Sequence, residues 1–307
     1  MAFNLYFAGC GDTSVVDFKL KHNTNQLLSQ LNERKAILDW IESMKKKAEN
    51  KCKLFIDSGA WSAHSKGKEV DIDDYIYFLN SYDDYFYIYA ELDKIPGKFR
   101  CIKTVEEKLK APIISWDNYL YMKDRVKSRD KLLPVFHQGE NFKWLKNMLE
   151  YKHEDTQNHI PYIGISPAND SSVAGKIAFI EECFNIIKNS NNPNVKTHAF
   201  GMTSLKVLEK YPFTSADSTS YLQSAINGNI FTKYGCLNIS NRRPYKDNVI
   251  FLNDKTLLLS EVEKYGYTID ELSSNSNNRV IYNMKFLIDW CNNYQYTPDN
   301  FKSIKLI

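Results

Sequence analysis

Eight short apolar runs, each ending in small or polar residues, recur through the first two-thirds of the chain and restrict the folds open to it. Runs of this length and bulk are typical of parallel β-strands, because such strands are buried on both faces. The runs are Leu5–Ala8, Leu54–Asp57, Phe86–Glu91, Ile113–Trp116, Leu133–Phe136, Tyr162–Ser166, Thr197–Phe200 and Phe213–Ala216.

Helix-like segments separate most of these runs. We expect helices at Asp73–Leu79, Asn141–Leu149, Ser172–Lys188 and Ser204–Lys210. Eight strands that alternate with helices predict an α/β fold of the (β/α)8, or TIM-barrel, type. A doubly wound open sheet is the alternative, but eight strands would make it wide, and no G-x-G-x-x-G motif follows the first run.

The sequence changes in character after residue 245. We expect a short strand at Val249–Leu252, a helix near Leu257–Tyr265, a polar break at Ser273–Asn278 and a helix near Arg279–Asn292. The chain is therefore predicted to have two parts, a catalytic barrel over residues 1–245 and a C-terminal, α-rich extension over residues 246–307 that packs on it.

The composition excludes several classes of protein. With 43% hydrophobic and 25% charged residues, the chain can form a sizeable core. Its net charge of +3 gives no overall basic field, so any nucleic-acid binding must come from local patches. The N-terminus lacks the basic start and long apolar run of a signal peptide, and no run approaches the length that spans a bilayer. We expect a cytoplasmic protein with reduced thiols and no membrane partner.

Polar and small residues follow the expected strands, where a barrel places its active site. The segments are Asp57-Ser58-Gly59, Glu91-Leu92-Asp93, Ser115-Trp116-Asp117, His137-Gln138-Gly139-Glu140, Gly164 with Ser166, Gly201-Met202-Thr203 and Asp217-Ser218-Thr219. Their carboxylates suit either a divalent metal ion or general acid–base and nucleophilic catalysis. Single aspartates here could also cap helices, and lone histidines such as His137 and His198 are more often structural.

Six motifs in this part of the chain occur in a recognisable order between Leu54 and Tyr221. They are DSGAW (57–61), ELD (91–93), PVFHQGE (134–140), YIGIS (162–166), HAFGMTS (198–204) and SADSTSY (215–221). This order resembles the tRNA-guanine transglycosylase superfamily. Within that superfamily, the chain is most similar to the shorter phage and bacterial paralogues that insert 7-deazaguanine bases into DNA.

The resemblance implies a role for each of three aspartates. Asp217 is expected to be the nucleophile, which attacks C1′ of the nucleotide and holds a covalent glycosyl-enzyme intermediate. Asp57 is expected to be the acid–base residue, which protonates the departing guanine and deprotonates the incoming base. Asp93 is expected to accept hydrogen bonds from the base edge.

Further residues of the same motifs are expected to bind the substrate. The resemblance assigns base recognition to Gln138 and to the backbone at Gly164. Ser58, Gly59, Gly201 and Met202 complete the expected substrate site, and Met202 or Trp61 is expected to cover a face of the planar base.

One part of the family pattern is missing. The tRNA enzymes carry a zinc site with a C-x-C-x-x-C motif and a distant histidine, but here the region from Cys236 onward has only Cys236 and Cys291 and no histidine. We expect no metal and no cofactor. The missing zinc region favours DNA over tRNA as the polynucleotide, although tRNA stays the alternative.

The expected function is therefore that of a pentosyltransferase, which replaces guanine in DNA with a 7-deazaguanine derivative. The free 7-deazaguanine base is its co-substrate, and the host cytoplasm is its location if a phage encodes it. Arg242 and Arg243 are expected to contact DNA phosphates, while Lys123, Arg125, Lys127 and Arg129 fit a solvated helix equally well. The alternatives are a queuine-type tRNA enzyme, an N-glycoside hydrolase with the same aspartates, and a barrel that only binds nucleic acid. The sequence leaves the oligomeric state open.

Overall fold

The computed structural model describes residues 3–46, 52–202, 204–241 and 254–296, with the side chain of residue 255 left aside. The chain forms two compact units. The first contains residues 3–8 and Thr24–Asp217, and the second contains Gly9–Asn23 and Ser218–Gln295. The boundary predicted at residue 245 lies outside the described residues, and so do Val249–Leu252, Arg242 and Arg243.

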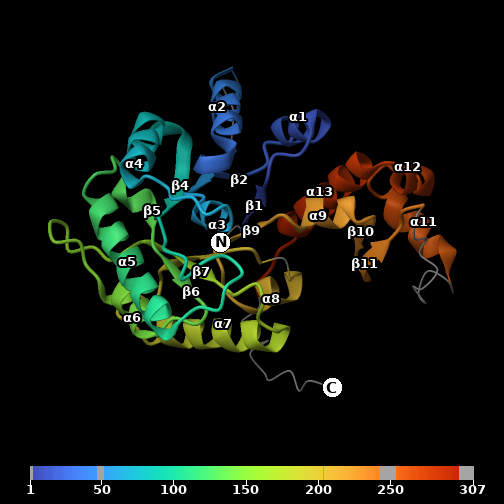
Figure 1. The fold of residues 1–307 in the computed structure, drawn as a ribbon. Coiled ribbons are helices and arrows are strands. Elements are labelled where there is room, and N and C mark those ends of the chain that lie inside the picture. Colours follow the sequence, from blue (N-terminus) through green and yellow to red (C-terminus); the bar gives the residue numbers. More distant parts are fainter. Residues whose placement is uncertain (1–2, 47–51, 203, 242–253, 297–307) are drawn as a thin grey trace. The chain divides into compact units, whose positions relative to one another are not determined.

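The first unit is built on a parallel sheet that curves into a barrel (Figure 1). Its strands follow one another in the order β5-β4-β3-β2-β1-β9-β8-β7-β6. They are β1 (Asn4–Ala8), β2 (Gln26–Ser29), β3 (Leu54–Asp57), β4 (Phe86–Ala90), β5 (Leu132–Leu133), β6 (Val135–His137), β7 (Tyr162–Ser166), β8 (Lys196–Ala199) and β9 (Ser215–Ser218). The α/β barrel expected from the sequence is confirmed.

Pro134 divides one strand of this barrel into two halves. β5 pairs with β4, and β6 pairs with β7, so the segment that contains both halves joins the two ends of the sheet. Proline has no N–H to donate, which interrupts the ladder. Around it, the Leu133 carbonyl accepts from Glu91 N–H (3.0 Å), and the Pro134 carbonyl accepts from Gly164 N–H (2.8 Å). Counting β5 and β6 together, eight strands close the ring.

The Glu91 side chain completes the hydrogen bonding at this closure. The Val135 N–H donates to Glu91 Oε1 at 2.8 Å, in the place where a neighbouring carbonyl would accept in an unbroken ladder. Glu91 is fully buried, and burial raises its pKa well above the usual value.

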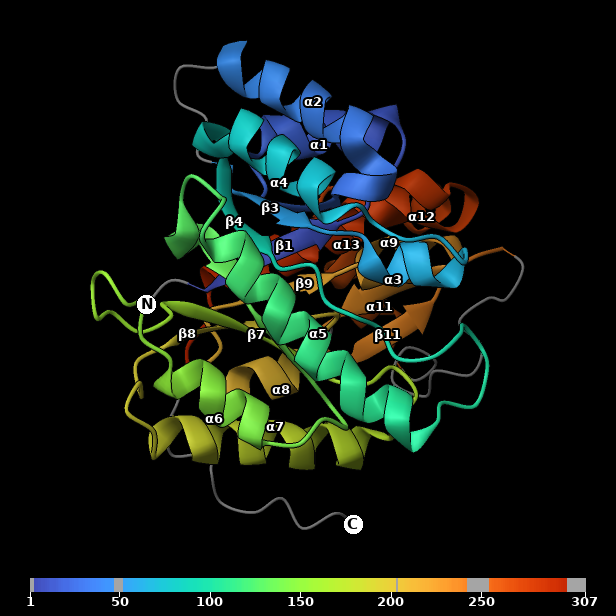
Figure 2. The ribbon, with the colours of Figure 1, turned by 60° about the vertical axis from the view of Figure 1, so that its left-hand side comes forward.

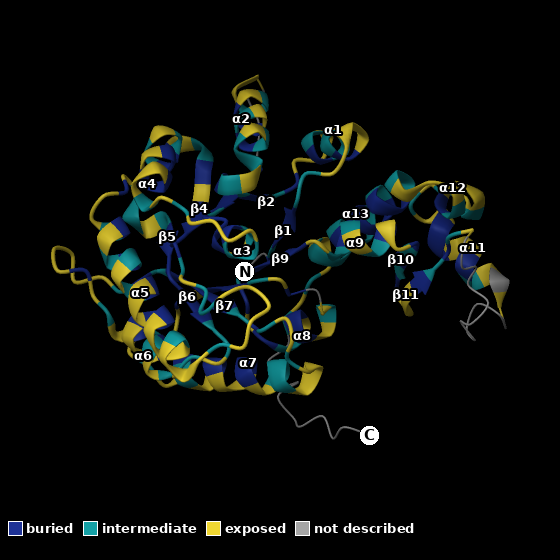
Figure 3. Ribbon diagram, viewed as in Figure 1, coloured by how far each residue is buried: buried dark blue, intermediate teal, exposed yellow. Residues whose placement is uncertain are grey.

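Helices cover the outside of the barrel (Figure 2). They are α2 (Gln30–Lys46), α3 (Ala60–Ser65), α4 (Ile72–Ser81), α5 (Val105–Lys123), α6 (Lys143–Glu150), α7 (Val173–Lys188) and α8 (Leu205–Lys210), with 3₁₀ turns at Asp83–Tyr85 and Arg129–Lys131. The strands are buried, whereas the outward faces of the helices are exposed (Figure 3). Inside the ring, residues from seven strands form one apolar cluster that includes Tyr6, Phe55 and Tyr162. The helices expected at 73–79, 141–149, 172–188 and 204–210 are confirmed within a few residues.

The strand predicted at Ile113–Trp116 is wrong, because these residues lie inside α5. Thr104 and Glu107 form a capping box that starts the helix, as each side chain accepts from the other residue's backbone N–H. The buried residues of α5 have helical spacing, which includes Ala111, Ser115, Tyr119 and Met122. Ile113 and Ile114 point outward, so the segment Ser115-Trp116-Asp117 is not a strand end.

The sequence analysis missed β2. This strand contains only two apolar residues, and it begins with the buried Gln26, whose amide donates to Thr24 Oγ1 at 2.7 Å. β2 pairs with both β1 and β3, and its last residue, Ser29, lies opposite Asp57.

The second unit is mainly helical. It contains α1 (Thr13–Lys21), α9 (Ser220–Ile226), the hairpin of β10 (Asn229–Thr232) and β11 (Gly235–Asn238), α11 (Lys255–Glu263), α12 (Ile269–Ser274) and α13 (Ser276–Asn292). Its core contains Ile230, Leu258, Leu272 and Tyr282. The two C-terminal helices expected from the sequence correspond to α11 and α13. None of the helices in the described part of the chain is both long and apolar enough to cross a membrane.

The barrel closure generates a prediction about Gly164. A Cβ atom at this position would lie 2.5 Å from Phe200 Cε2 and 3.1 Å from Leu133 Cδ1, so Gly164→Ala should lower the free energy of unfolding by about 1–3 kcal/mol. Urea denaturation measures the change. In the double variant with Phe200→Leu, the loss should be smaller than the sum of the two single losses, because the shortened side chain makes room. Additive losses would contradict the proposed clash.

Candidate functional site

Three aspartates meet at the carboxyl ends of the barrel strands. Asp57 is the last residue of β3, Asp93 lies three residues after β4, and Asp217 lies in β9. Asp93 and Asp217 are close enough to Asp57 for both of their charges to raise its pKa. The structure thus brings together the three residues that the sequence singled out.

Asp57 has an environment that favours its protonated form. Burial is the main cause, and together with the charges of Asp93, Asp217 and Glu33 it raises the pKa of Asp57 to about 7. A hydrogen bond from Gly59 N–H to Asp57 Oδ2, at 3.0 Å, acts in the opposite direction. A carboxyl group with this pKa can both give and take a proton near neutral pH.

The turn after Asp57 requires glycine. Gly59 has a φ of +84°, and a Cβ atom there would lie 2.6 Å from Ser29 Oγ and 2.7 Å from Leu31 Cβ. Ser58 is fully buried, and its hydroxyl accepts from Ala60 N–H at 3.2 Å. These two residues therefore fix the turn that positions Asp57.

Asp217 is held by two groups from the neighbouring strand end. Gly201, in a left-handed conformation with φ of +59°, donates its N–H to Asp217 Oδ1 at 2.8 Å. The Nε2 atom of His198 lies 3.3 Å from the same oxygen. Asp217 is 7% exposed, and its other oxygen, Oδ2, has no hydrogen-bond partner among the described residues.

A buried chain of hydrogen bonds extends from Asp217 into the barrel. His198 Nδ1 lies 2.6 Å from Ser215 Oγ, which lies 2.6 Å from the hydroxyl of Tyr162. Burial lowers the pKa of His198 despite the Asp217 charge, and burial raises the pKa of Tyr162. A carboxylate only accepts hydrogen bonds, so the neutral His198 ring donates from Nε2 to Asp217 and accepts at Nδ1. Ser215 then donates to Nδ1, and Tyr162 donates to Ser215.

The His198 ring is also fixed by aromatic neighbours. Its centroid lies 4.6 Å from that of Phe55, 4.5 Å from that of Phe200 and 5.9 Å from that of Tyr6, all in edge-to-face geometry. The sequence analysis favoured a structural role for a lone histidine, whereas the structure places His198 in direct contact with Asp217.

Asp93 pairs with His137 rather than standing alone. His137 Nε2 lies 3.1 Å from Asp93 Oδ2, and the His137 backbone N–H donates to Glu140 Oε2 at 3.2 Å. Burial disfavours the charged ring, but the carboxylates of Asp93 and Glu140 outweigh it and raise the pKa of His137. Burial also raises the pKa of Glu140.

Gln138 and Gly164 are engaged within the protein. The Gln138 amide oxygen accepts from Ala168 N–H at 3.0 Å, and its Nε2 donates to Ser171 Oγ at 3.0 Å and to the Gly175 carbonyl at 3.1 Å. Both of its N–H groups are therefore in use. Gly164 lies in the middle of β7, where its N–H donates to Pro134. In this structure, neither residue has an N–H free to read a base.

The remaining expected residues lie in different settings. Met202 is 6% exposed, whereas Trp61, on α3, is 51% exposed. Lys123 and Arg129 lie close to the start of β5, at the opposite end of the strands from the aspartates, where Arg129 pairs with Asp155 at 2.8 Å. The side chains of Lys123 and Arg129 are only 12% and 26% exposed, and each is paired with an aspartate, so neither is freely solvated.

The sequence analysis did not identify two residues that act on the aspartates: Glu33 acts on Asp57, and Ser215 contacts Asp217's neighbour His198. Glu33, in α2, accepts the Ser29 N–H at 2.8 Å and raises the pKa of Asp57 by its charge. Ser215 joins His198 to Tyr162. The position of Glu33 follows from β2, which the sequence analysis missed. The position of Ser215 follows from the register of β8 against β9, in which His198 lies opposite Ser215.

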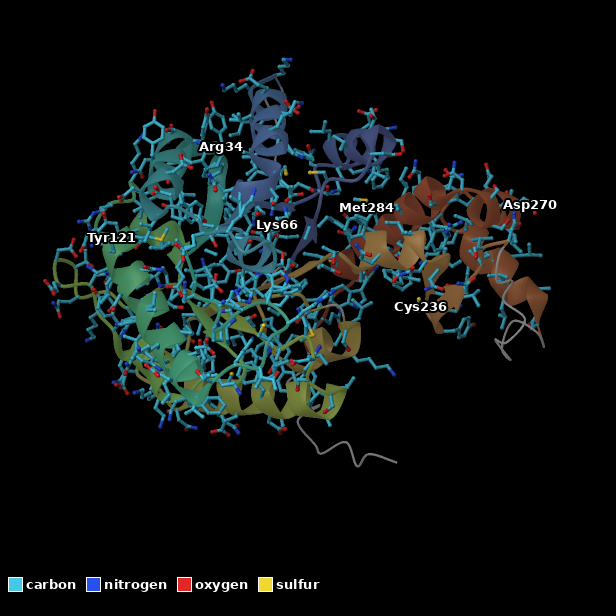
Figure 4. The ribbon with its side chains drawn as sticks, in the orientation of Figure 1. Arg34, Lys66, Tyr121, Cys236, Asp270 and Met284 are labelled. Carbon is cyan, nitrogen blue, oxygen red and sulfur yellow. The ribbon has the colours of Figure 1, made fainter. Side chains whose placement is uncertain are left out.

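The two cysteines that follow the barrel lie on different elements of the second unit. Cys236 is exposed on β11 and is labelled in Figure 4, whereas Cys291 lies on α13. Within the residues that the structure describes, no group of three or more His, Cys, Asp or Glu side chains is arranged to hold a metal ion. We derive no step of the reaction from a metal.

No family model matches the chain, and no curated protein sequence matches it either. The functional interpretation therefore depends on the geometry of the site and on the motifs themselves.

The pKa of Asp57 generates a stability prediction. Its usual value is 3.8, so between about pH 4 and pH 7 the folded protein keeps a proton that the unfolded chain has released. The free energy of unfolding therefore falls as the pH rises through this interval. Asp57→Asn should be more stable than the parent protein at pH 8, on the order of a few kcal/mol, with no such advantage at pH 4.

Chemical denaturation at both pH values measures this difference. Asp84→Asn, at an exposed position of the same barrel unit, is the matched control and should show the same small change at both. An Asp57→Asn effect that does not depend on pH would contradict the raised pKa.

Proposed function

We propose that the protein exchanges guanine in DNA for a 7-deazaguanine base through a covalent aspartyl intermediate. The observation that carries this proposal is the contrast between two carboxyl groups at the same end of the barrel. Asp57 has a pKa of about 7, as a proton donor and acceptor requires, whereas Asp217 is held at Oδ1 by Gly201 and His198 and keeps Oδ2 for attack. The order of the six sequence motifs supports the choice of base and reaction.

In the first half of the proposed reaction, Asp217 Oδ2 attacks C1′ of the target nucleotide. The C–N glycosidic bond breaks, its electron pair goes to the guanine, and Asp57 gives that guanine a proton. The transition state has oxocarbenium character, which the adjacent carboxylate stabilises.

In the second half, the incoming base gives a proton to Asp57, and its nitrogen attacks C1′. The ester bond to Asp217 breaks and regenerates the carboxylate. The proton that Asp57 gave away is thereby replaced, so the cycle needs no oxidant, reductant or further reactant.

The hydrogen bonds behind Asp217 suit this role. Gly201 and His198 both bind Oδ1, which leaves Oδ2 to form the new bond. Because the pKa of His198 is lowered, the ring stays neutral and does not form a tight ion pair that would weaken the nucleophile. The chain through Ser215 to Tyr162 fixes the ring tautomer that donates from Nε2.

Base recognition is assigned to Asp93. A carboxylate can accept from the two adjacent N–H groups that guanine and 7-deazaguanine share. His137 orients Asp93 from one side, and Glu140 holds the backbone of His137. Glu140 itself is the closest candidate for contact with a 7-substituent.

Asp217 gives the decisive test of the proposal. Protein is incubated with guanine-containing DNA and radiolabelled guanine, and label in the DNA is measured. Asp217→Asn should lower incorporation by at least roughly 1,000-fold, because no covalent intermediate can form. With the parent protein and no added base, a denaturing gel should show a protein–DNA adduct that Asp217→Asn lacks.

Asp84→Asn is the control for this assay and should incorporate label at the parent rate. Normal exchange by Asp217→Asn would overturn the nucleophile assignment. Abasic sites without incorporation would show a hydrolase, and incorporation into tRNA but not DNA would change the polynucleotide.

Asp57 predicts opposite pH dependences for the two halves of the reaction. Guanine release needs protonated Asp57, so its single-turnover rate should be constant below about pH 7 and fall tenfold per pH unit above it. Base incorporation from the isolated adduct needs the ionised form, so its rate should fall below about pH 7. Rapid quenching measures both rates. If both show the same pH dependence, Asp57 does not serve both halves.

A further inference from the structure

A pocket of about 320 Å³ lies in the barrel unit outside the group of aspartates. Three aromatic rings, Trp61, His64 and Phe99, line it together with two cationic side chains, Arg100 and Lys103. Asp170 is also part of its wall. The volume falls within the range of pockets that bind small ligands.

The chain segments that line this pocket all follow the carboxyl ends of barrel strands. Trp61 and His64 lie on α3, directly after Asp57, and the segment with Phe99 and Lys103 follows Asp93. Asp170 follows β7. The pocket is therefore built from loops on the same face of the barrel as the three aspartates.

The aromatic rings present open faces. Trp61 is 51% exposed and Phe99 is 36% exposed, which is unusual for side chains of this size. The three rings contact one another, with centroids 6.1 Å apart for Trp61 and Phe99, 6.2 Å for Trp61 and His64, and 6.1 Å for His64 and Phe99. Phe99 lies edge-on to the other two rings, at 82° to Trp61 and 87° to His64, so a planar ligand can stack on the exposed face of Trp61 with Phe99 at its edge.

The charge of the pocket favours an anion. The guanidinium of Arg100 lies 5.2 Å from the centre of the Phe99 ring, and Arg100 has a φ of +60°, a conformation that side-chain-bearing residues rarely adopt. Burial lowers the pKa of His64, and the charge of Lys103 lowers it further. The charge of Lys103 also acts to lower the pKa of His137, the residue that pairs with Asp93. The field of this lysine thus extends from the pocket to the aspartates.

We propose that this pocket binds a nucleotide of single-stranded DNA beside the nucleotide that reacts. The base stacks on Trp61, with Phe99 against its edge, and Lys103 and Arg100 bind the adjoining phosphate. Stacking on aromatic side chains tolerates every base, and cations bind the backbone without regard to sequence. The choice of DNA rests on the proposed function, whereas the recognition of a base and a phosphate rests on the pocket itself. Such a contact holds the strand while the target base is out of its stack.

The experiment uses a fluorescein-labelled oligothymidylate, which binds but contains no guanine to react. Fluorescence anisotropy is measured over a range of salt concentrations with the full chain. Trp61→Ala should weaken binding about tenfold or more, whereas Trp61→Phe, which keeps a ring, should retain most of the affinity. Lys103→Gln should weaken binding and reduce the slope of log affinity against log salt by about 0.7.

Two variants on the outer helices serve as matched controls. Tyr77→Ala removes a 70% exposed aromatic ring from α4, and Lys146→Gln removes an exposed cation from α6. Both should bind as the parent protein does. Thermal unfolding of each variant confirms that the fold is retained, and recovery of affinity in Trp61→Phe shows that the ring is what matters.

Parent affinity in Trp61→Ala, or no oligonucleotide binding by the parent protein, overturns the proposal. Tighter binding of oligouridylate than of oligothymidylate overturns the choice of DNA, and binding of a free nucleotide but no strand overturns the strand contact. If binding depends on Trp61 but no base exchange occurs, the pocket assignment is supported and the proposed reaction is contradicted. If exchange occurs but binding does not depend on Trp61, the reaction is supported and the pocket assignment is contradicted.

Discussion

The closure of the barrel at Pro134 is the constraint on which the site depends. A parallel sheet brings the carboxyl ends of its strands to one edge, but only closure turns that edge into a ring. The proline removes one ladder donor at the seam, and Glu91 compensates by accepting the next one, from Val135. β4 is next to β3, and β9 follows β2 and β1 on the other side of β3, yet the charges of both Asp93 and Asp217 act on Asp57.

The second determinant is how each carboxyl group is solvated. Asp57 is buried near other carboxylates and accepts one backbone hydrogen bond, from Gly59. Its pKa is therefore raised to about 7. Asp217 instead has Gly201 N–H and His198 Nε2 as neighbours of its Oδ1 atom. Two identical side chains on one ring of strands therefore acquire different chemical properties from their neighbours alone.

The strand-end aspartates were predictable because hydrophobic runs locate strand ends, and Asp57 ends its run directly. The strand prediction at Ile113–Trp116 was wrong because four residues of a partly buried helix can have the same apolar pattern as a short strand. β2 was hidden because Gln26 is buried with its own hydrogen bonds. The link between His198 and Ser215 crosses from one strand to the next, and only the register of the sheet shows it.

Gln138 has a consequence that extends beyond its local bonds. Its amide ties the end of β6 to Ala168, Ser171 and Gly175, the segment that also carries Asp170. Gln138 adjoins His137, the neighbour of Asp93, so one amide side chain joins the wall of the aromatic pocket to the strand end beside the aspartates.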